Sequence, residues 1–195
     1  MEKVDRPKIP KKLYRKIEDD VTNLYIELGL TVPIDPFEIA QRLGYVVIRL
    51  SEIEFPDELL AVLDSKEGER KDGLSYFDVT QNRYVILVND IGVKYEERNR
   101  FTVMHEIGHI RLGHKTNSLL AEMMANHYAA YALAPSVLID YYDCDDFVDV
   151  MNIFEVSDIC AYHCFRRYCN WTTITLFYES EKRLLEYYRS KKENV

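Results

Sequence analysis

Two histidines one helical turn apart carry the clearest chemical signal in the sequence. The segment HEIGH places His105 and His109 four positions apart, with Glu106 between them. On a helix, side chains at this spacing lie one above the other on the same face, so two imidazoles can bind one metal ion. Glu106 projects about 100° round the helix from His105, beside the metal, where it can take a proton from a metal-bound water. The pattern HExxH is typical of zinc peptidases.

The residues around HEIGH predict that its helix is buried. Between Phe101 and Ile110, Glu106 is the only residue with a formal charge. A carboxylate in a buried helix is costly unless a cation, a proton or hydrogen bonds compensate it. A metal ion beside Glu106 meets this need. The alternative is a core helix with two hydrogen-bonded histidines and a neutral glutamate.

A catalytic zinc ion needs a third protein ligand and one open position for water. Glu122 is the best candidate, because it is the only formally charged residue between Lys115 and Asp140 and lies in the apolar segment LLAEMMANHYAAYALA. A glutamate on a narrow exposed stripe is the alternative. Asn126 follows Glu122 by one turn and can accept the Nδ1 proton of a ligand histidine, most simply His105. For Asn126, an ordinary position on the helix surface is the alternative.

The other histidines fit a ligand role less well. His114 follows His109 by five residues, whereas the metzincin pattern has its third histidine six residues on. His127 and His163 have suitable side chains but no supporting pattern.

Three cysteines near the C-terminus form a cluster of potential ligands. With His163, the residues Cys160, Cys164 and Cys169 supply enough ligands for a second, closed zinc site. Cysteines four residues apart on one amphipathic helix are more often packed in the core, which is the interpretation we favour.

The elements that must position these residues follow from local patterns. Asp35, Pro36 and Glu38 indicate a capping box at a helix start, Ser157 can cap another helix, and Pro135 ends one. We expect helices over about residues 11–29, 36–44, 96–113, 118–134 and 158–169, and a last helix that runs to about 190. We expect strands over 45–50, 74–79 and 84–89, the last two joined as a hairpin.

Three remaining stretches are less regular. Residues 52–73 read as loop with at most a short helix, residues 140–155 are acidic, and 172–177 (TTITLF) read as a strand or the start of the last helix. The fold class is therefore α+β, with a small antiparallel sheet packed on two central helices and additional C-terminal helices.

Length and charge limit the organisation and the partners. The 195 residues predict a core over 1–135, including a basic arm over 1–12, and a mainly helical extension over 136–195. A net charge of −8 argues against direct contact with nucleic acid. The sequence shows neither a bilayer-spanning apolar stretch nor a secretory signal, so we expect a cytoplasmic protein with four free thiols.

Two linked segments resemble a known family. The sequence FTVMHEIGHIRLGH, followed by EMMANHYAAYALAP, is similar to the ImmA/IrrE metallopeptidases, whose pattern runs FTxAHELGH and then ExxANxFAA. The resemblance covers roughly residues 14–135 and implies a zincin-like fold. It also implies one Zn²⁺ per chain, held by His105, His109 and Glu122, with Glu106 as the catalytic acid and base. The family usually has alanine at Met104 and phenylalanine at Tyr128, which leaves the shape of the pocket open.

The resemblance also implies a substrate. Relatives cleave a partner repressor that carries a helix-turn-helix domain, in mobile elements or stress responses, and so release transcription. Alternatives are a zinc-bearing regulator that binds without cutting, the toxin of a toxin–antitoxin pair, and a purely structural zinc domain. We expect an extended substrate to add to the edge of strand 84–89, unless that strand is an ordinary core strand. For the oxyanion-stabilising group, Tyr128 and Tyr131 lie on the appropriate helix.

Overall fold

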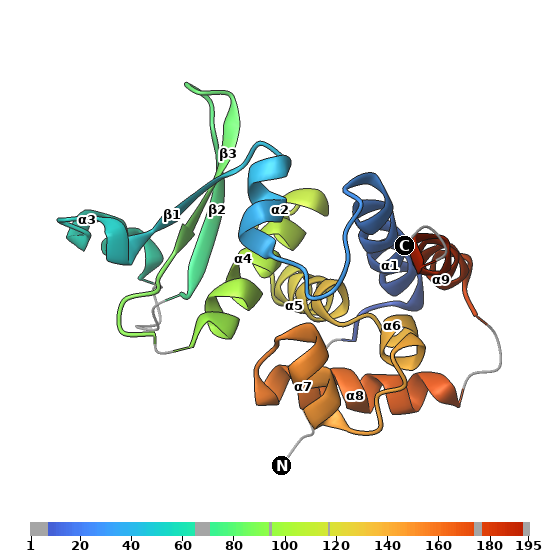
Figure 1. The fold of residues 1–195 in the computed structure, drawn as a ribbon. Helices are drawn as coiled ribbons and strands as arrows, with labels where there is room; N and C mark the ends of the chain where they lie inside the picture. Colours follow the sequence, from blue (N-terminus) through green and yellow to red (C-terminus); the bar gives the residue numbers. More distant parts are fainter. Residues whose placement is uncertain (1–7, 65–70, 94, 117, 174–176, 193–195) are drawn as a thin grey trace, which may run out of the picture.

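The computed structural model describes residues 8–64, 71–93, 95–116, 118–173 and 177–192 (Figure 1). Within these ranges the fold is α+β and mostly helical, with a small three-stranded sheet. The helices are α1 (Lys11–Glu27), α2 (Pro36–Arg42), η1 (Leu50–Glu52), α3 (Asp57–Leu63), α4 (Glu96–Arg111), α5 (Leu119–Leu133), α6 (Ser136–Tyr141), α7 (Phe147–Phe154), α8 (Asp158–Thr172) and α9 (Glu179–Lys192). The strands are β1 (Val46–Arg49), β2 (Gly73–Asp78) and β3 (Arg83–Val88).

The sheet is mixed, which corrects the prediction of an antiparallel sheet. Its order is β1-β3-β2, and β2 pairs antiparallel with β3 as the predicted hairpin requires. β1 instead lies parallel to β3, with Val46 opposite Val85. A parallel pair needs a long crossover between its strands, and residues 50–82 supply one. Local sequence patterns define the hairpin, but they do not determine which edge of it a distant strand joins.

Several predicted helix starts are confirmed by their capping contacts. Asp35 accepts a hydrogen bond from the Phe37 backbone N–H at 2.9 Å, and Ser157 accepts one from Cys160 at 3.3 Å. The second half of the predicted capping box is absent, because Glu38 pairs with Arg42 at 3.5 Å.

The acidic stretch 140–155, for which no element was predicted, holds the end of α6 and all of α7. Asp146 caps α7 by accepting from the backbone N–H groups of Val148 and Asp149. Residues 1–7 of the predicted basic arm and residues 174–176 of TTITLF lie outside the described residues.

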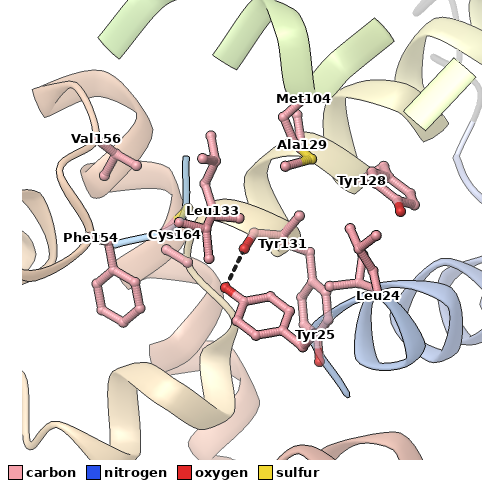
Figure 2. Close-up of a cluster of buried hydrophobic side chains, with 14 of the residues drawn as sticks. Leu24, Tyr25, Met104, Tyr128, Ala129, Tyr131, Leu133, Phe154, Val156 and Cys164 are labelled. Carbon is pink, nitrogen blue, oxygen red and sulfur yellow. Dashed lines mark hydrogen bonds between the residues drawn. The ribbon is translucent and has the colours of Figure 1, made fainter. Parts of the chain in front are cut away.

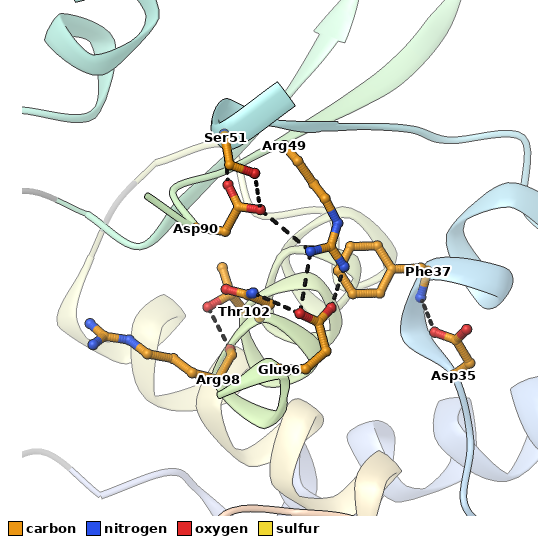
Figure 3. Close-up of polar contacts among 9 residues, drawn as sticks. Asp35, Phe37, Arg49, Ser51, Asp90, Glu96, Arg98 and Thr102 are labelled. Carbon is orange, nitrogen blue, oxygen red and sulfur yellow. Dashed lines mark hydrogen bonds and ion pairs between the residues drawn. The ribbon is translucent and has the colours of Figure 1, made fainter. Parts of the chain in front are cut away.

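A polar network fixes the start of α4 against the sheet. The Arg49 guanidinium pairs with Asp90 at 3.4 Å and with Glu96, the first residue of α4, and it lies 4.1 Å from the centre of the Phe37 ring (Figure 3). Asp90 in turn accepts from the backbone N–H of Ser51 at 2.9 Å and from its hydroxyl at 2.7 Å. These contacts join β1, the loop after β3 and α4 into one unit.

The hydrophobic core runs through both halves of the chain. One cluster of buried side chains extends from Ile17 in α1 to Tyr188 in α9. Figure 2 shows Leu24 and Tyr25 of α1 beside Tyr131 of α5, and the Tyr25 hydroxyl donates to the Ala132 carbonyl at 2.7 Å. The C-terminal helices therefore pack against the core; the boundary at residue 135 stays a prediction.

None of the helices in the described ranges is both long and apolar enough to cross a bilayer.

Candidate metal centre

Three side chains predicted as ligands lie together between α4 and α5. His105 Nε2 is 3.0 Å from His109 Nε2, and Glu122 Oε2 is 3.3 Å from the first and 3.7 Å from the second. Ligand atoms on a tetrahedron with bonds of ~2.0–2.1 Å lie about 3.3 Å apart. Two imidazoles and one carboxylate are a donor set that catalytic zinc uses, so the three residues fit the ion. Among the described His, Cys, Asp and Glu residues, they are the one group with this geometry.

The electrostatics of the group favour a bound cation. Hydrogen bonds to His105 and His109 hold the pKa of Glu122 well below its usual value, despite partial burial. The carboxylate is therefore negatively charged throughout the neutral range. A cation that takes the place of the ring protons at Nε2 would meet one negative charge and two imidazole lone pairs.

Each candidate ligand histidine has a contact at its other ring nitrogen. His105 Nδ1 lies 3.0 Å from Asn126 Oδ1, the contact predicted for Asn126. An amide oxygen only accepts, so His105 carries its proton on Nδ1 and leaves Nε2 free for a metal. His109 Nδ1 lies 3.0 Å from His114 Nδ1. His114 therefore contacts a candidate ligand histidine, a position that sequence spacing did not reveal.

Glu106 lies beside the ligands and is buried, with 6 % of its surface exposed. The Ser75 hydroxyl of β2 donates to Glu106 Oε2 at 2.7 Å. The close approach of β2 to α4 depends on Gly73. A Cβ at this position would lie 2.6 Å from Thr102 Cγ2 and 3.3 Å from Glu106 Cγ. Neither Ser75 nor Gly73 was predicted to take part in the site, because the alternation of a strand gives the face of a residue but not the helix that this face covers.

The candidate metal centre opens into a cleft of about 460 Å³ between β2, α4 and α5. Residues 73–75 of β2 line one wall, and His105, Glu106 and Glu122 lie in the same cleft. The strand that borders it is therefore β2, an edge strand. The expectation that strand 84–89 offers a free edge is wrong, since β3 is paired on both sides.

The two tyrosines considered as oxyanion stabilisers do not line this cleft. Tyr128 is fully buried and its hydroxyl donates to Asp20 Oδ2 at 2.8 Å, on the side of α5 that faces α1. Tyr131 is also buried, in the core between α1 and α5. The lining includes Lys71, Arg98 and Lys115 as the cationic side chains.

The cysteine cluster does not form a second metal site within the described residues. Cys160 and Cys164 have their sulfurs 3.9 Å apart, and the Cys164 thiol donates to the Ala130 carbonyl at 3.4 Å. Cys169 is exposed, and all four cysteines are free thiols. The pair packs against α5, as favoured from the sequence.

Comparison with known families agrees with this geometry. The model of peptidase family M78, described as the IrrE N-terminal-like domain, matches residues 40–151. The matched segment contains β1 to α5 and hence Glu106 and all three candidate ligands. No protein with a curated description matches the chain. Because the family match covers more than half of the sequence, the protein belongs to the ImmA/IrrE family of metallopeptidases.

Proposed function

We propose that this peptidase is a zinc-dependent endopeptidase of the HExxH type, with one Zn²⁺ per chain. The observation that carries the proposal is the meeting of His105, His109 and Glu122 beside Glu106 in one cleft. A purely structural zinc site would be closed by four ligands, whereas this group has three and faces a cleft.

The side chains suggest a division of roles. The ion, when bound, would supply Lewis-acid chemistry for activating water and polarising the scissile carbonyl. Glu106 accepts a proton from the attacking water and returns it to the leaving amine. Ser75 holds the Glu106 carboxylate in place through its hydroxyl, 2.7 Å away. Asn126 and His114 orient the two ligand histidines.

The substrate we propose is a protein, namely a helix-turn-helix repressor of a mobile element or stress regulon in the cytoplasm. The family resemblance supports this substrate, and the cleft has in its wall residues 73–75 of β2, an outer strand of the sheet in the described residues. An extended segment can add to the edge of such a strand through main-chain hydrogen bonds. The acidic net charge of −8 disfavours direct binding to nucleic acid.

The test is to mix the purified protein with the regulator encoded by the adjacent gene. Wild-type protein loaded with zinc should produce a defined fragment, and a chelator should abolish it. Glu106→Gln should keep one zinc equivalent and lose at least about 100-fold in rate, since general-base catalysis contributes about 10²–10⁴-fold. Glu58→Gln, an exposed glutamate of α3, is the matched control and should cleave normally.

Two results would favour other functions. Derepression by Glu106→Gln as strong as by wild type would indicate a zinc-bearing regulator that binds the repressor without cutting it. Growth arrest on expression of the protein alone would indicate the toxin of a toxin–antitoxin pair.

A further inference from the structure

A larger groove continues from the metal cleft toward the C-terminal helices. We call it the α4–α8 groove; its volume is about 1280 Å³ and it lies between α4, α5, α7 and the start of α8. Asp72, Arg98, Phe101 and Asn126 line both the groove and the metal cleft. The groove and the metal cleft therefore adjoin, so two neighbouring parts of one substrate chain can lie in them.

The groove offers apolar surface on both sides. Phe101 and Ala130 contribute from α4 and α5, and Met151, Val156 and Ile159 from the C-terminal part. Ile159 is 68 % exposed and Tyr95, on the opposite wall, is 72 % exposed. Large apolar side chains gathered in a concave surface are typical of binding sites. The metal cleft, by contrast, is lined mainly by polar groups.

The side chains that line the groove carry an excess of negative charge. Both arginines in its lining are neutralised within the protein: Arg98 pairs with Asp72, and Arg100 pairs with Glu155 at 3.3 Å. Glu96 pairs with Arg49. The remaining carboxylates, Glu97 and Asp158, have no ion-pair partner among the described residues. They lie in the first turns of α4 and α8.

We propose that the α4–α8 groove binds an extended segment of the protein substrate that carries apolar side chains next to lysine or arginine. The inference rests on the proposed peptidase function and adds a substrate class to it. Apolar side chains of the segment lie on Met151 and Ile159, and its cationic groups face Glu97 and Asp158. The C-terminal helices are then part of the substrate-binding surface, so residues 136–195 contribute to specificity.

The test uses two peptides of about a dozen residues with the same apolar positions, one with lysine and one with glutamate between them. Each is titrated into zinc-loaded Glu106→Gln protein, which removes turnover from the measurement. The lysine peptide should bind about three- to tenfold more tightly at low salt, because exposed ion pairs each contribute modestly and are screened by added salt. Methyl NMR signals of Met151 and Ile159 should shift, and that of Ile139, buried in α6, should not.

Substitutions of the two carboxylates test whether they cause the preference for the lysine peptide. Glu97→Gln combined with Asp158→Asn should remove most of the preference for the lysine peptide. Glu58→Gln combined with Asp57→Asn, a matched pair in the first turn of α3, should leave the preference intact.

Equal affinity for both peptides, or unmoved Met151 and Ile159 signals, would overturn the proposal. Changes of these signals with protein concentration alone would assign the groove to a second copy of the chain and also overturn it. Peptide binding in the groove and cleavage by the wild-type protein are separate results, so failure of one can be told from failure of the other. Binding of the lysine peptide in the groove supports the inference even if wild-type protein cleaves nothing. Cleavage without any charge preference would support the peptidase and refute the groove.

Discussion

At the scale of single residues, the two candidate ligand histidines are oriented by different kinds of group. Asn126 presents an oxygen that only accepts, which fixes the proton of His105 on Nδ1. His114 presents a ring nitrogen that can accept or donate, so the His109 tautomer depends on that of its neighbour. Burial lowers the pKa of His114, which favours a neutral ring able to accept from His109 Nδ1. The orientation of His105 is therefore the simpler of the two to test.

We predict that Asn126→Ala weakens zinc binding by about 10- to 100-fold, the usual effect of losing a partner that orients a ligand. Asn126→Asp keeps an oxygen acceptor and should retain most of the affinity. Competition with a chromophoric chelator measures both constants. Thermal unfolding of the metal-free proteins serves as the control, because Asn126 contacts the site and should contribute little to the core. Unchanged zinc affinity in Asn126→Ala would remove Asn126 from the site.

At the scale of elements, the site depends on how closely α4 and α5 approach. A Cβ at Gly108 would lie 3.0 Å from both Cβ and Cγ of Tyr128. These atoms are at the base of the tyrosine side chain, whose hydroxyl is held by Asp20. Asp20 also pairs with Arg111 at 2.6 Å, so the tyrosine is anchored to both α1 and the end of α4. The glycine inside HEIGH therefore sets the distance between the two helices that carry the candidate ligands.

We predict that Gly108→Ala destabilises the protein by about 1–3 kcal/mol, the usual cost of overpacking. The sign of the change in unfolding free energy distinguishes a tight helix contact from a loose one, because in an unconstrained helix Gly→Ala would stabilise by about 1 kcal/mol. Urea unfolding of metal-free protein measures the change. In a Tyr128→Ala background, which lacks Cγ and the ring, Gly108→Ala should cost less than in wild type, because only the contact with Cβ remains. A more stable Gly108→Ala single variant would show that α4 and α5 can separate freely.

Helices and their caps can be predicted from the local sequence, whereas contacts between distant segments cannot. The common helix face of His105 and His109 follows from the HExxH spacing, whereas Glu122 was predicted from its isolated charge in an apolar segment and from the family resemblance. The pairing of β1 and the contact of Ser75 with Glu106 depend on tertiary packing. The starts of α7 and α8 carry the same kind of cap, yet Asp146 is one of several acidic residues in its stretch and did not stand out.

At the scale of the whole molecule, helices from both ends of the chain bury ionisable groups together. Glu18 of α1 lies 3.9 Å from His127 of α5, with Arg167 of α8 among the charges that act on both. Burial raises the pKa of Glu18 to about 7 and lowers the pKa of His127 to about 3. The 3.9 Å separation is too long for a hydrogen bond, and His127 Nε2 has no other partner among the described residues. Burial therefore prevails over ion pairing, and both groups favour their neutral forms.

This arrangement makes the free energy of unfolding depend on pH. Because the pKa of Glu18 is about 7 in the folded protein and 4.5 as the ordinary value, the folded state holds a proton that the unfolded state releases between these values. The stability associated with Glu18 is fully present below pH 4.5 and is lost as the pH rises through 7. His127 acts in the opposite direction below its ordinary pKa of 6.5, so the Glu18 contribution must be isolated by a difference measurement.

We predict that Glu18→Gln, which is neutral at every pH, gains stability relative to wild type as the pH rises from about 4.5 to 8. The gain should approach about 3 kcal/mol, from 1.36 kcal/mol per pKa unit. His127 titrates in both proteins and cancels in the difference. Urea unfolding of metal-free protein at several pH values measures it, with Glu27→Gln as the matched control, an exposed glutamate of the same helix that is not among the charges acting on Glu18. A constant difference for Glu18→Gln would mean that Glu18 is ionised in the folded state, and hence that ion pairing with His127 outweighs the cost of burial.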